Sequence, residues 1–252
     1  MNKTILAFDT NIWIYLTKLN YQPLLDRLIE EVSKEDLIIL VNDVILLEWN
    51  RNKSTLIKSL TDSIKHEYQS AKQISHYIEN RIDKEHYVNI LKKYSGLDER
   101  INSAESRVAK VEQLLTTCTC VNTTDQQKLY VANLAINKIP PFKKSKNNFN
   151  DALIILSLTE YVNALVKQNG STLPYKYDFV FISNNPNDFK DPETNEIFST
   201  LLIDCDNLRI ITVTDLAFGL SEKERLIDDF DDWLEDMLDT QIEYEAEIAR
   251  GK

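Results

Sequence analysis

Glycine is scarce in this chain: 252 residues include 4 glycines, 6 prolines and 3 cysteines. With so few glycines no glycine-rich loop of the kind that cradles nucleotide phosphates is present, which argues against nucleotide-dependent enzymes. The composition also excludes collagen-like and low-complexity chains. Cys118, Cys120 and Cys205 form an odd set in which one residue separates the first two. We interpret them as reduced thiols, because this spacing is too tight for ordinary zinc knuckles.

Long hydrophobic runs are also lacking. No continuous apolar run reaches the roughly 20 residues that cross a bilayer, and the N-terminal residues do not have the pattern of a signal peptide. We therefore expect a cytoplasmic protein that does not associate with a membrane. With 43% hydrophobic residues, the chain is able to bury a full-sized core.

Positive charge is low overall but concentrated in one region. The net charge is -11, yet residues 51–150 hold 17 Lys and Arg against 10 Asp and Glu, a net charge of +7. Residues 221–252 hold 4 basic and 12 acidic side chains, a net charge of -8. The basic region is either a phosphate-binding face or an ordinary solvated helical surface.

Four short apolar runs predict buried strands, at residues 4–8, 37–41, 178–183 and 208–213. Helical patterns follow the first two runs, at Ile12 to Leu16 and Val44 to Trp49. Asn42 and Asp43 are candidate caps of the second helix, and Asn150 is a candidate cap of a long helix that continues to about Gln168. Continuous apolar strands that alternate with helices are typical of a parallel sheet covered on both faces. We predict an α/β fold of three α/β/α layers around a central, mostly parallel sheet of about five strands.

Helical periodicity dominates the region between the second and third predicted strands. Apolar residues recur every three or four positions from about residue 53 to residue 115, with an interruption at Ser95 and Gly96. This predicts a helical hairpin inserted at about residues 52–117 of a domain that spans residues 1–220. Residues 221–252 are expected to form an acidic C-terminal helix, which is either a plain soluble helix or a segment that competes with RNA for the basic insertion or docks a basic partner.

Four carboxylates are candidates for one site, because each follows a predicted strand or opens a helix at the sheet edge where open α/β folds bind ligands. They are Asp9, Glu48, Asp151 and Asp188. Four clustered carboxylates repel one another unless a hard divalent cation such as Mg²⁺ or Mn²⁺ neutralises them. Each also has a structural alternative: a helix cap for Asp9, an ion pair with Arg51 for Glu48, a favourable helix N-terminus for Asp151 and a turn for Asp188.

The sequence around these acids resembles the PIN domain nucleases, named after the PilT N-terminus. The matching segments are Phe8-Asp9-Thr10-Asn11 after the first strand, Glu48 after the second, Asn150-Asp151-Ala152-Leu153-Ile154 at the start of a buried helix, and residues 181–189, which contain Ser183, Asn185 and Asp188. The resemblance covers about residues 1–50 and 148–216. It is greatest to larger bacterial PIN-like proteins, which carry a helical insertion.

The resemblance implies specific roles for these residues. Asp9, Glu48, Asp151 and Asp188 would be the catalytic ligands of Mg²⁺ or Mn²⁺. The residues that orient these ligands or a bound water would be Thr10, Asn11, Ser183 and Asn185. Asn184 and Asn185 are amides where some family members carry a further acid, so the resemblance leaves one-metal and two-metal catalysis open.

The expected activity is hydrolysis of a phosphodiester, with RNA as the favoured substrate, by a water that the metal ion activates. Lys143, Lys144 and Lys146 precede Asp151 and would either hold neighbouring phosphates or form a solvated loop. The family resemblance suggests a toxin or defence effector with a regulatory or inhibitory protein partner. A DNA-directed nuclease and an inactive module that binds RNA or protein are the alternatives, and the sequence leaves homo-oligomerisation open.

Overall fold

The computed structural model describes residues 4–33, 37–94, 96–142, 148–168, 178–183, 190–191, 194, 196–203 and 209–213. Five strands form one sheet in the order β3-β2-β1-β4-β5. All neighbouring strands are parallel. The strands are β1 (Thr4–Phe8), β2 (Leu37–Asn42), β3 (Thr119–Val121), β4 (Asp178–Ile182) and β5 (Arg209–Val213).

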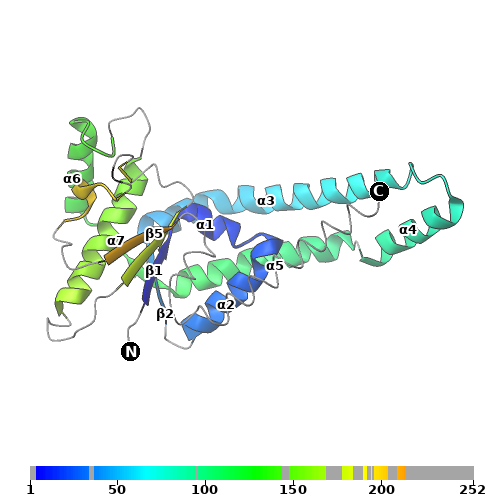
Figure 1. Ribbon diagram of the computed structural model, residues 1–252, viewed down its shortest axis with the longest axis horizontal. Coiled ribbons are helices and arrows are strands. Elements are labelled where there is room, and N and C mark those ends of the chain that lie inside the picture. Colours follow the sequence, from blue (N-terminus) through cyan, green and yellow to red (C-terminus); the bar gives the residue numbers. More distant parts are fainter. Residues whose placement is uncertain are drawn as a thin grey trace.

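Seven α-helices are described around the sheet. They are α1 (Thr10–Tyr15), α2 (Gln22–Ser33), α3 (Asp43–Ile74), α4 (Arg81–Tyr94), α5 (Leu97–Thr117), α6 (Asp125–Ile136) and α7 (Phe149–Gln168). Helices α6 and α7 lie on one side of the sheet, and α1, α2 and the near end of α5 lie on the other (Figure 1). This arrangement confirms the predicted α/β class and its three layers. The acidic segment at residues 221–252 lies outside the described residues.

The central strands are apolar along their whole length because helices cover both faces of the sheet. Ile5, Leu6, Ala7 and Phe8 of β1 are at most 1% exposed. β3 was not predicted from the sequence. It is an edge strand of three residues in which only Val121 is buried, so it leaves neither an apolar run nor an alternating pattern.

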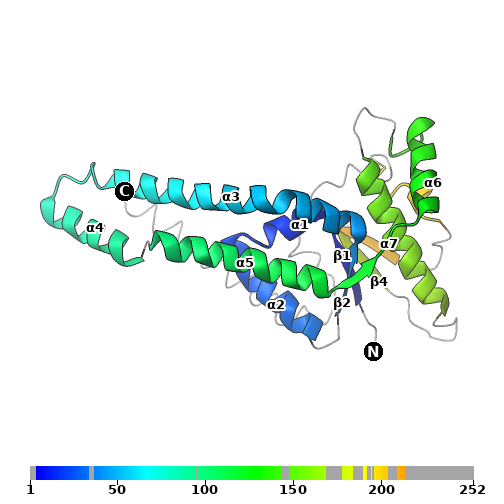
Figure 2. The same cartoon turned by 180° about the vertical axis from the view of Figure 1, so that it is seen from behind.

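Helices α3 and α5 form a long arm that extends away from the sheet, with α4 at its far end (Figures 1 and 2). At 1.5 Å per residue, the 32 residues of α3 span about 48 Å. The helix after β2 and the first helix of the insertion are therefore one continuous helix. The arm also has a break between the end of α3 at Ile74 and the start of α4 at Arg81, where the sequence pattern predicted no interruption.

The start of α3 is fixed to the core by Asn42. The side chain of Asn42 accepts a hydrogen bond from the backbone N–H of Val44 at 2.7 Å, which caps the helix as predicted. Its amide also donates to Ser157 Oγ of α7 at 2.6 Å. Asn42 is fully buried, so this one side chain sets the position of α3 relative to α7.

Helix α7 is the most apolar helix among the described residues. Its length and composition would allow it to cross a membrane, and 56% of the most apolar window is buried within the protein. The sequence, which has no long continuous apolar run, did not predict a helix of this length and composition. Ten residues of α7, including Leu153, Ile155 and Leu156, are buried in the fold, so α7 packs as a core helix.

Candidate functional site

The candidate site lies at the point where the chain order of the sheet reverses. Strand β1 lies between β2, which follows it in sequence, and β4, which comes much later. In open α/β sheets, ligands bind beside the carboxyl ends of strands at such a switch point. Phe8 at the end of β1 is in register with Ile182 at the end of β4, and the Asp9 N–H donates to the Ile182 carbonyl at 2.9 Å. Asp9 and Ser183 therefore leave the sheet side by side.

Asp9 occupies the N-cap position of α1, but its side chain makes no capping hydrogen bond. Its carboxylate instead accepts a hydrogen bond from Ser183 Oγ at 2.9 Å. Burial raises the pKa of Asp9 above 3.8, and the nearby charge of Glu48 raises it further. Hydrogen bonds from Ser183, the Thr10 backbone and Asn11 act in the opposite direction but do not cancel the effect of burial. The carboxylate is thus placed where its charge is costly.

Glu48 lies in the second turn of α3, and both of its oxygens are held. Thr10 Oγ1 donates to Glu48 Oε2 at 2.5 Å, and Asn150 Nδ2 donates to Glu48 Oε1 at 2.7 Å. These donors come from α1 and α7, so one carboxylate joins three helices. No ion pair joins Glu48 to Arg51 among the described contacts, which removes the structural alternative considered for Glu48.

The contact from Asn150 brings the first turn of α7 to Glu48. The sequence suggested that Asn150 caps this helix, but α7 begins at Phe149, so Asn150 lies inside the first turn and that prediction was wrong. The side chain that we assigned to a cap is used to orient a carboxylate. Asp151 is the next residue in the same turn and is half-buried. Its placement on this turn is compatible with the predicted role, which stays a prediction.

The hydrogen bonds that Asp9 and Glu48 accept from described residues come from neutral donors only. Among the described residues, these donors are Thr10, Asn11, Asn150 and Ser183. Carboxylates that only stabilise a fold are commonly matched by Lys or Arg when they are buried. Here two neighbouring acids have no such partner in the described part of the chain, so no cation among the described residues balances their negative charge.

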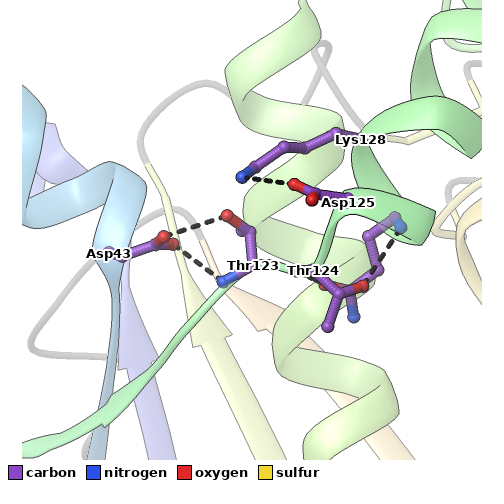
Figure 3. A network of polar contacts seen from close by, with 6 residues as sticks. Asp43, Thr123, Thr124, Asp125 and Lys128 are labelled. Atoms are coloured by element: carbon purple, nitrogen blue, oxygen red, sulfur yellow. Dashed lines mark hydrogen bonds and ion pairs between the residues drawn. The ribbon is translucent and has the colours of Figure 1, made fainter.

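A third carboxylate at this sheet edge, Asp43, has a structural role. It accepts hydrogen bonds from the backbone N–H of Thr123 at 3.1 Å and from Thr123 Oγ1 at 2.9 Å, which ties the start of α3 to the end of β3 (Figure 3). The next residue, Thr124, caps α6 in a reciprocal capping box with Gln127. Because Thr123 uses both oxygens of Asp43, this acid is distinguished from Asp9 and Glu48 by its contacts.

Several predicted site residues cannot be placed. Asp188 and Asn185 lie outside the described residues, as do Lys143, Lys144 and Lys146. Their assigned roles stay predictions. Cys118 and Cys120 are free thiols, in agreement with the sequence interpretation, and burial raises the pKa of Cys118 to about 12. Cys205 also falls outside the described part of the chain.

The donor set fits a hard divalent cation in its chemistry. Asp9 and Glu48 supply oxygen atoms alone, which suit Mg²⁺ and Mn²⁺, and a carboxylate oxygen that accepts one hydrogen bond retains a second lone pair. Three or more His, Cys, Asp or Glu residues arranged to hold a metal ion are not found within the described residues. The fit therefore depends on the charge and chemistry of two described acids, with Asp151 and Asp188 as the further predicted ligands.

A comparison with protein families identifies the fold and its general activity. The family model described as PIN domain matches residues 6–189, which include most of β1, all of β2 to β4, the whole arm and every predicted acidic ligand. PIN domains are generally nucleases and usually use divalent metal ions. Neither a curated protein nor a solved structure matches this chain. The match covers well over half of the 252 residues, and the chain belongs to the PIN domain family.

Proposed function

We propose that this protein is a Mg²⁺- or Mn²⁺-dependent endoribonuclease that acts as a toxin or defence effector. The observation that carries the proposal is the linkage of Asp9 to Glu48 at the switch point of the sheet, with neutral side chains as their partners. Asp9, Glu48, Asp151 and Asp188 would hold the cation. When bound, the cation supplies an acidified water and offsets the negative charge that develops on the phosphate.

The residues of this chain would position the acids beside the attacking water. Thr10 and Asn150 each fix one oxygen of Glu48, so that this carboxylate cannot rotate away from Asp9. Ser183 fixes Asp9 from the neighbouring strand. Such a preset arrangement lowers the cost of ordering the site during reaction. A binding module would gain nothing from holding two acids together without a basic partner, which favours catalysis over binding alone.

A cleavage assay tests the proposal. The full-length protein is incubated with Mn²⁺ and either single-stranded RNA, a stem-loop RNA or double-stranded DNA, beside the variants Asp9→Asn and Asp151→Asn. We expect cleavage of RNA by the wild type and a loss of at least about 100-fold in each variant, the size of effect seen when a group that stabilises the transition state is removed. Chelation by EDTA should abolish the activity.

The matched control is Asp43→Asn. This change removes a carboxylate from the same edge of the sheet, but one whose oxygens are used by Thr123. It should cleave RNA within about threefold of the wild type. Equal activity in the wild type and in Asp9→Asn would contradict the proposed site. Cleavage of DNA but not RNA would retain the nuclease and overturn its substrate.

A further inference from the structure

Four basic side chains stand at a constant spacing along α3. They are Arg51, Lys58, Lys65 and Lys72, each seven residues after the last, and all four are exposed. None forms an ion pair with a described residue. Two basic residues on the side of the arm where α3 and α5 meet are paired: Lys53 with Glu112 at 2.6 Å, and Arg100 with Glu67 at 2.5 Å. We call these four residues the basic stripe.

Helix geometry places the basic stripe on one face. Seven residues make nearly two turns, so successive members are rotated by only about 20° and lie about 10.5 Å apart along the axis. The stripe begins one turn after Glu48 and reaches about 36 Å from it at Lys72. It therefore forms a nearly straight row of positive charge that leads from the candidate site toward the end of the arm.

The opposite face of α3 is occupied by packing against α5. Leu56, Leu60 and Ile64 lie on that face, and both views show α5 running alongside α3 (Figures 1 and 2). The paired residues Lys53 and Glu67 border this interface. Asp62 is the one acid of α3 that falls among the members of the stripe. The face thus keeps a net charge of about +3, because four cations meet one carboxylate.

We propose that the basic stripe holds the phosphate backbone of a base-paired nucleic acid whose end or branch lies at the Asp9 and Glu48 site. This inference rests on the proposed function, since it deepens the nature of the substrate. Evenly spaced cations without acidic partners among the described residues match a regular polyanion, whose binding they favour by releasing counterions. The stripe thus offers contacts to phosphates and none that would read a base sequence.

The chemistry of the stripe favours paired over single strands. Proteins that hold single strands stack the bases on exposed aromatic side chains, but the two aromatic residues of α3, Trp49 and Tyr68, are buried and half-buried. A rigid helix of about 48 Å is straight, as is a short duplex, whereas an unpaired strand would have to be held extended against its own flexibility. Double-stranded RNA is recognised largely by shape and by its phosphates.

A binding experiment in EDTA separates the stripe from cleavage. A fluorescein-labelled RNA duplex of 24 base pairs is titrated with the wild type and with the variant R51Q/K58Q/K65Q/K72Q over a range of salt concentrations. Glutamine keeps the helix propensity close to that of Lys and Arg, so the arm should fold. We expect affinity at 50 mM salt to fall more than about tenfold, and the slope of log K against log salt to become shallower by about 3 to 4.

The control variant R81Q/K92Q/K128Q/K138Q removes the same number of charges from exposed positions off the stripe. Its salt slope should change by less than about one. An equal loss in both variants, or no loss in either, would overturn the stripe. The proposal would also be overturned if a single-stranded RNA of 24 nucleotides bound the wild type as tightly as the duplex does, and if the stripe variant reduced its salt slope by the same amount. A synthetic peptide of residues 221–252 provides a further test. If the wild type binds this peptide, and the stripe variant fails to bind it but still binds the duplex as tightly as the wild type, the stripe is a site for the acidic segment and our proposal is overturned.

Substrate length provides a second readout. Lys58 lies about 15 Å and Lys72 about 36 Å beyond Glu48, which correspond to about 5 and 13 base pairs of an A-form RNA duplex at a rise of about 2.8 Å each. K58Q should lower kcat/KM for RNA with about 6 paired positions beyond the cut, whereas K72Q should do so only above about 13. Loss of cleavage in Asp9→Asn with no dependence on length would leave the nuclease intact and overturn the stripe. Duplex binding as predicted without any cleavage would leave the stripe intact and overturn the nuclease.

Discussion

At the scale of single residues, the site combines a destabilising group with the contacts that hold it. Asp9 is 9% exposed, and its ionised form is opposed by burial and by the charge of Glu48. Proteins often give up stability at functional positions, so that a group is kept in a state that a bound ligand then favours. Because the pKa of Asp9 is higher in the folded chain than in the unfolded chain, the free energy of unfolding depends on pH.

Asp9→Asn should stabilise the protein at neutral pH in EDTA. An acid with a raised pKa in the folded state binds its proton more tightly there than in the unfolded chain, so its contribution to stability is largest at low pH and falls as pH rises through the folded-state pKa. Asparagine has nearly the same shape and carries no charge. The melting temperature should rise by about 2–4 °C for each kcal/mol gained. The gain should vanish as pH falls toward 3.8, and a variant less stable than the wild type at pH 7 would contradict it.

Added Mn²⁺ should make the wild type more stable than Asp9→Asn. A ligand that binds the folded state alone stabilises it by about 2.7 kcal/mol at 100 times its dissociation constant. The wild type should gain this amount and Asp9→Asn should gain little, since a neutral amide is a poorer ligand for a hard cation. Thermal unfolding with increasing Mn²⁺ measures both. A similar gain in the two proteins would place the metal ion away from Asp9.

At the scale of elements, the site depends on how the first turns of α1, α3 and α7 are held together. Strand ends place Asp9 and Ser183, whereas Glu48 is reached through Thr10 and Asn150. The buried cap Asn42 joins α3 to α7 nearly two turns before Glu48. The orientation of the acids therefore depends on contacts between helices as well as on the sheet.

Asn42→Ala should cost about 1–3 kcal/mol of unfolding free energy, because it removes a helix cap and leaves buried polar groups without a partner. Urea unfolding measures the loss. Thr124→Ala, which removes the exposed cap of α6, is the matched control and should cost about 1 kcal/mol or less. If the two changes cost the same, the contact with Ser157 does not contribute.

The elements that were predicted correctly are those with a strong local pattern. The runs at residues 4–8 and 37–41 lie in the middle of the sheet and are apolar throughout, so that both the strands and the acids that follow them were found. β3 was not predicted because it is short and mostly exposed. Helices α2 and α6 were not assigned, although Thr124 and Gln127 spell a capping box that would have indicated the start of α6.

The roles of some site residues could not be read from the sequence. Asn150 was placed as a cap because amides are frequent at caps, and only the fold shows that its amide reaches Glu48, 102 residues away. The seven-residue spacing of the basic stripe is visible in the sequence, but the exposure of its four side chains depends on which face of α3 packs against α5. Long-range pairing of this kind leaves no trace in local periodicity.

At the scale of the whole molecule, charge is divided between the arm region and the C-terminal segment. Residues 51–150 carry +7 and residues 221–252 carry -8, so that removing the latter changes the net charge from -11 to -3. We predict that deletion of residues 221–252 raises affinity for RNA at low salt without unfolding the protein. The effect should fade above about 0.3 M salt as screening increases. Fluorescence anisotropy measures the change, and unchanged affinity would remove the hypothesis of competition.

The outer half of the arm should be dispensable for folding. Buried apolar residues of α5 near the sheet, such as Val108, Val111 and Leu115, belong to the core, whereas the outer part of the arm buries few side chains. Joining residue 65 to residue 103 by a short Gly-Ser turn should leave a cooperative urea transition with a smaller m-value, because less surface is exposed on unfolding. Deletion of α6, whose Val131 and Leu134 lie in the core, is the contrasting control and should abolish the transition.

The projecting arm also affects how this protein travels through a gel-filtration column. A compact chain of 252 residues has a radius of gyration of about 18 Å, yet α3 alone is about 48 Å long. A 29.3 kDa monomer of this shape should have a large Stokes radius and elute at the volume of a considerably heavier sphere. Elution volume alone would thus overestimate the mass of the monomer, and the number of subunits has to be taken from light scattering or sedimentation equilibrium, which report mass independently of shape.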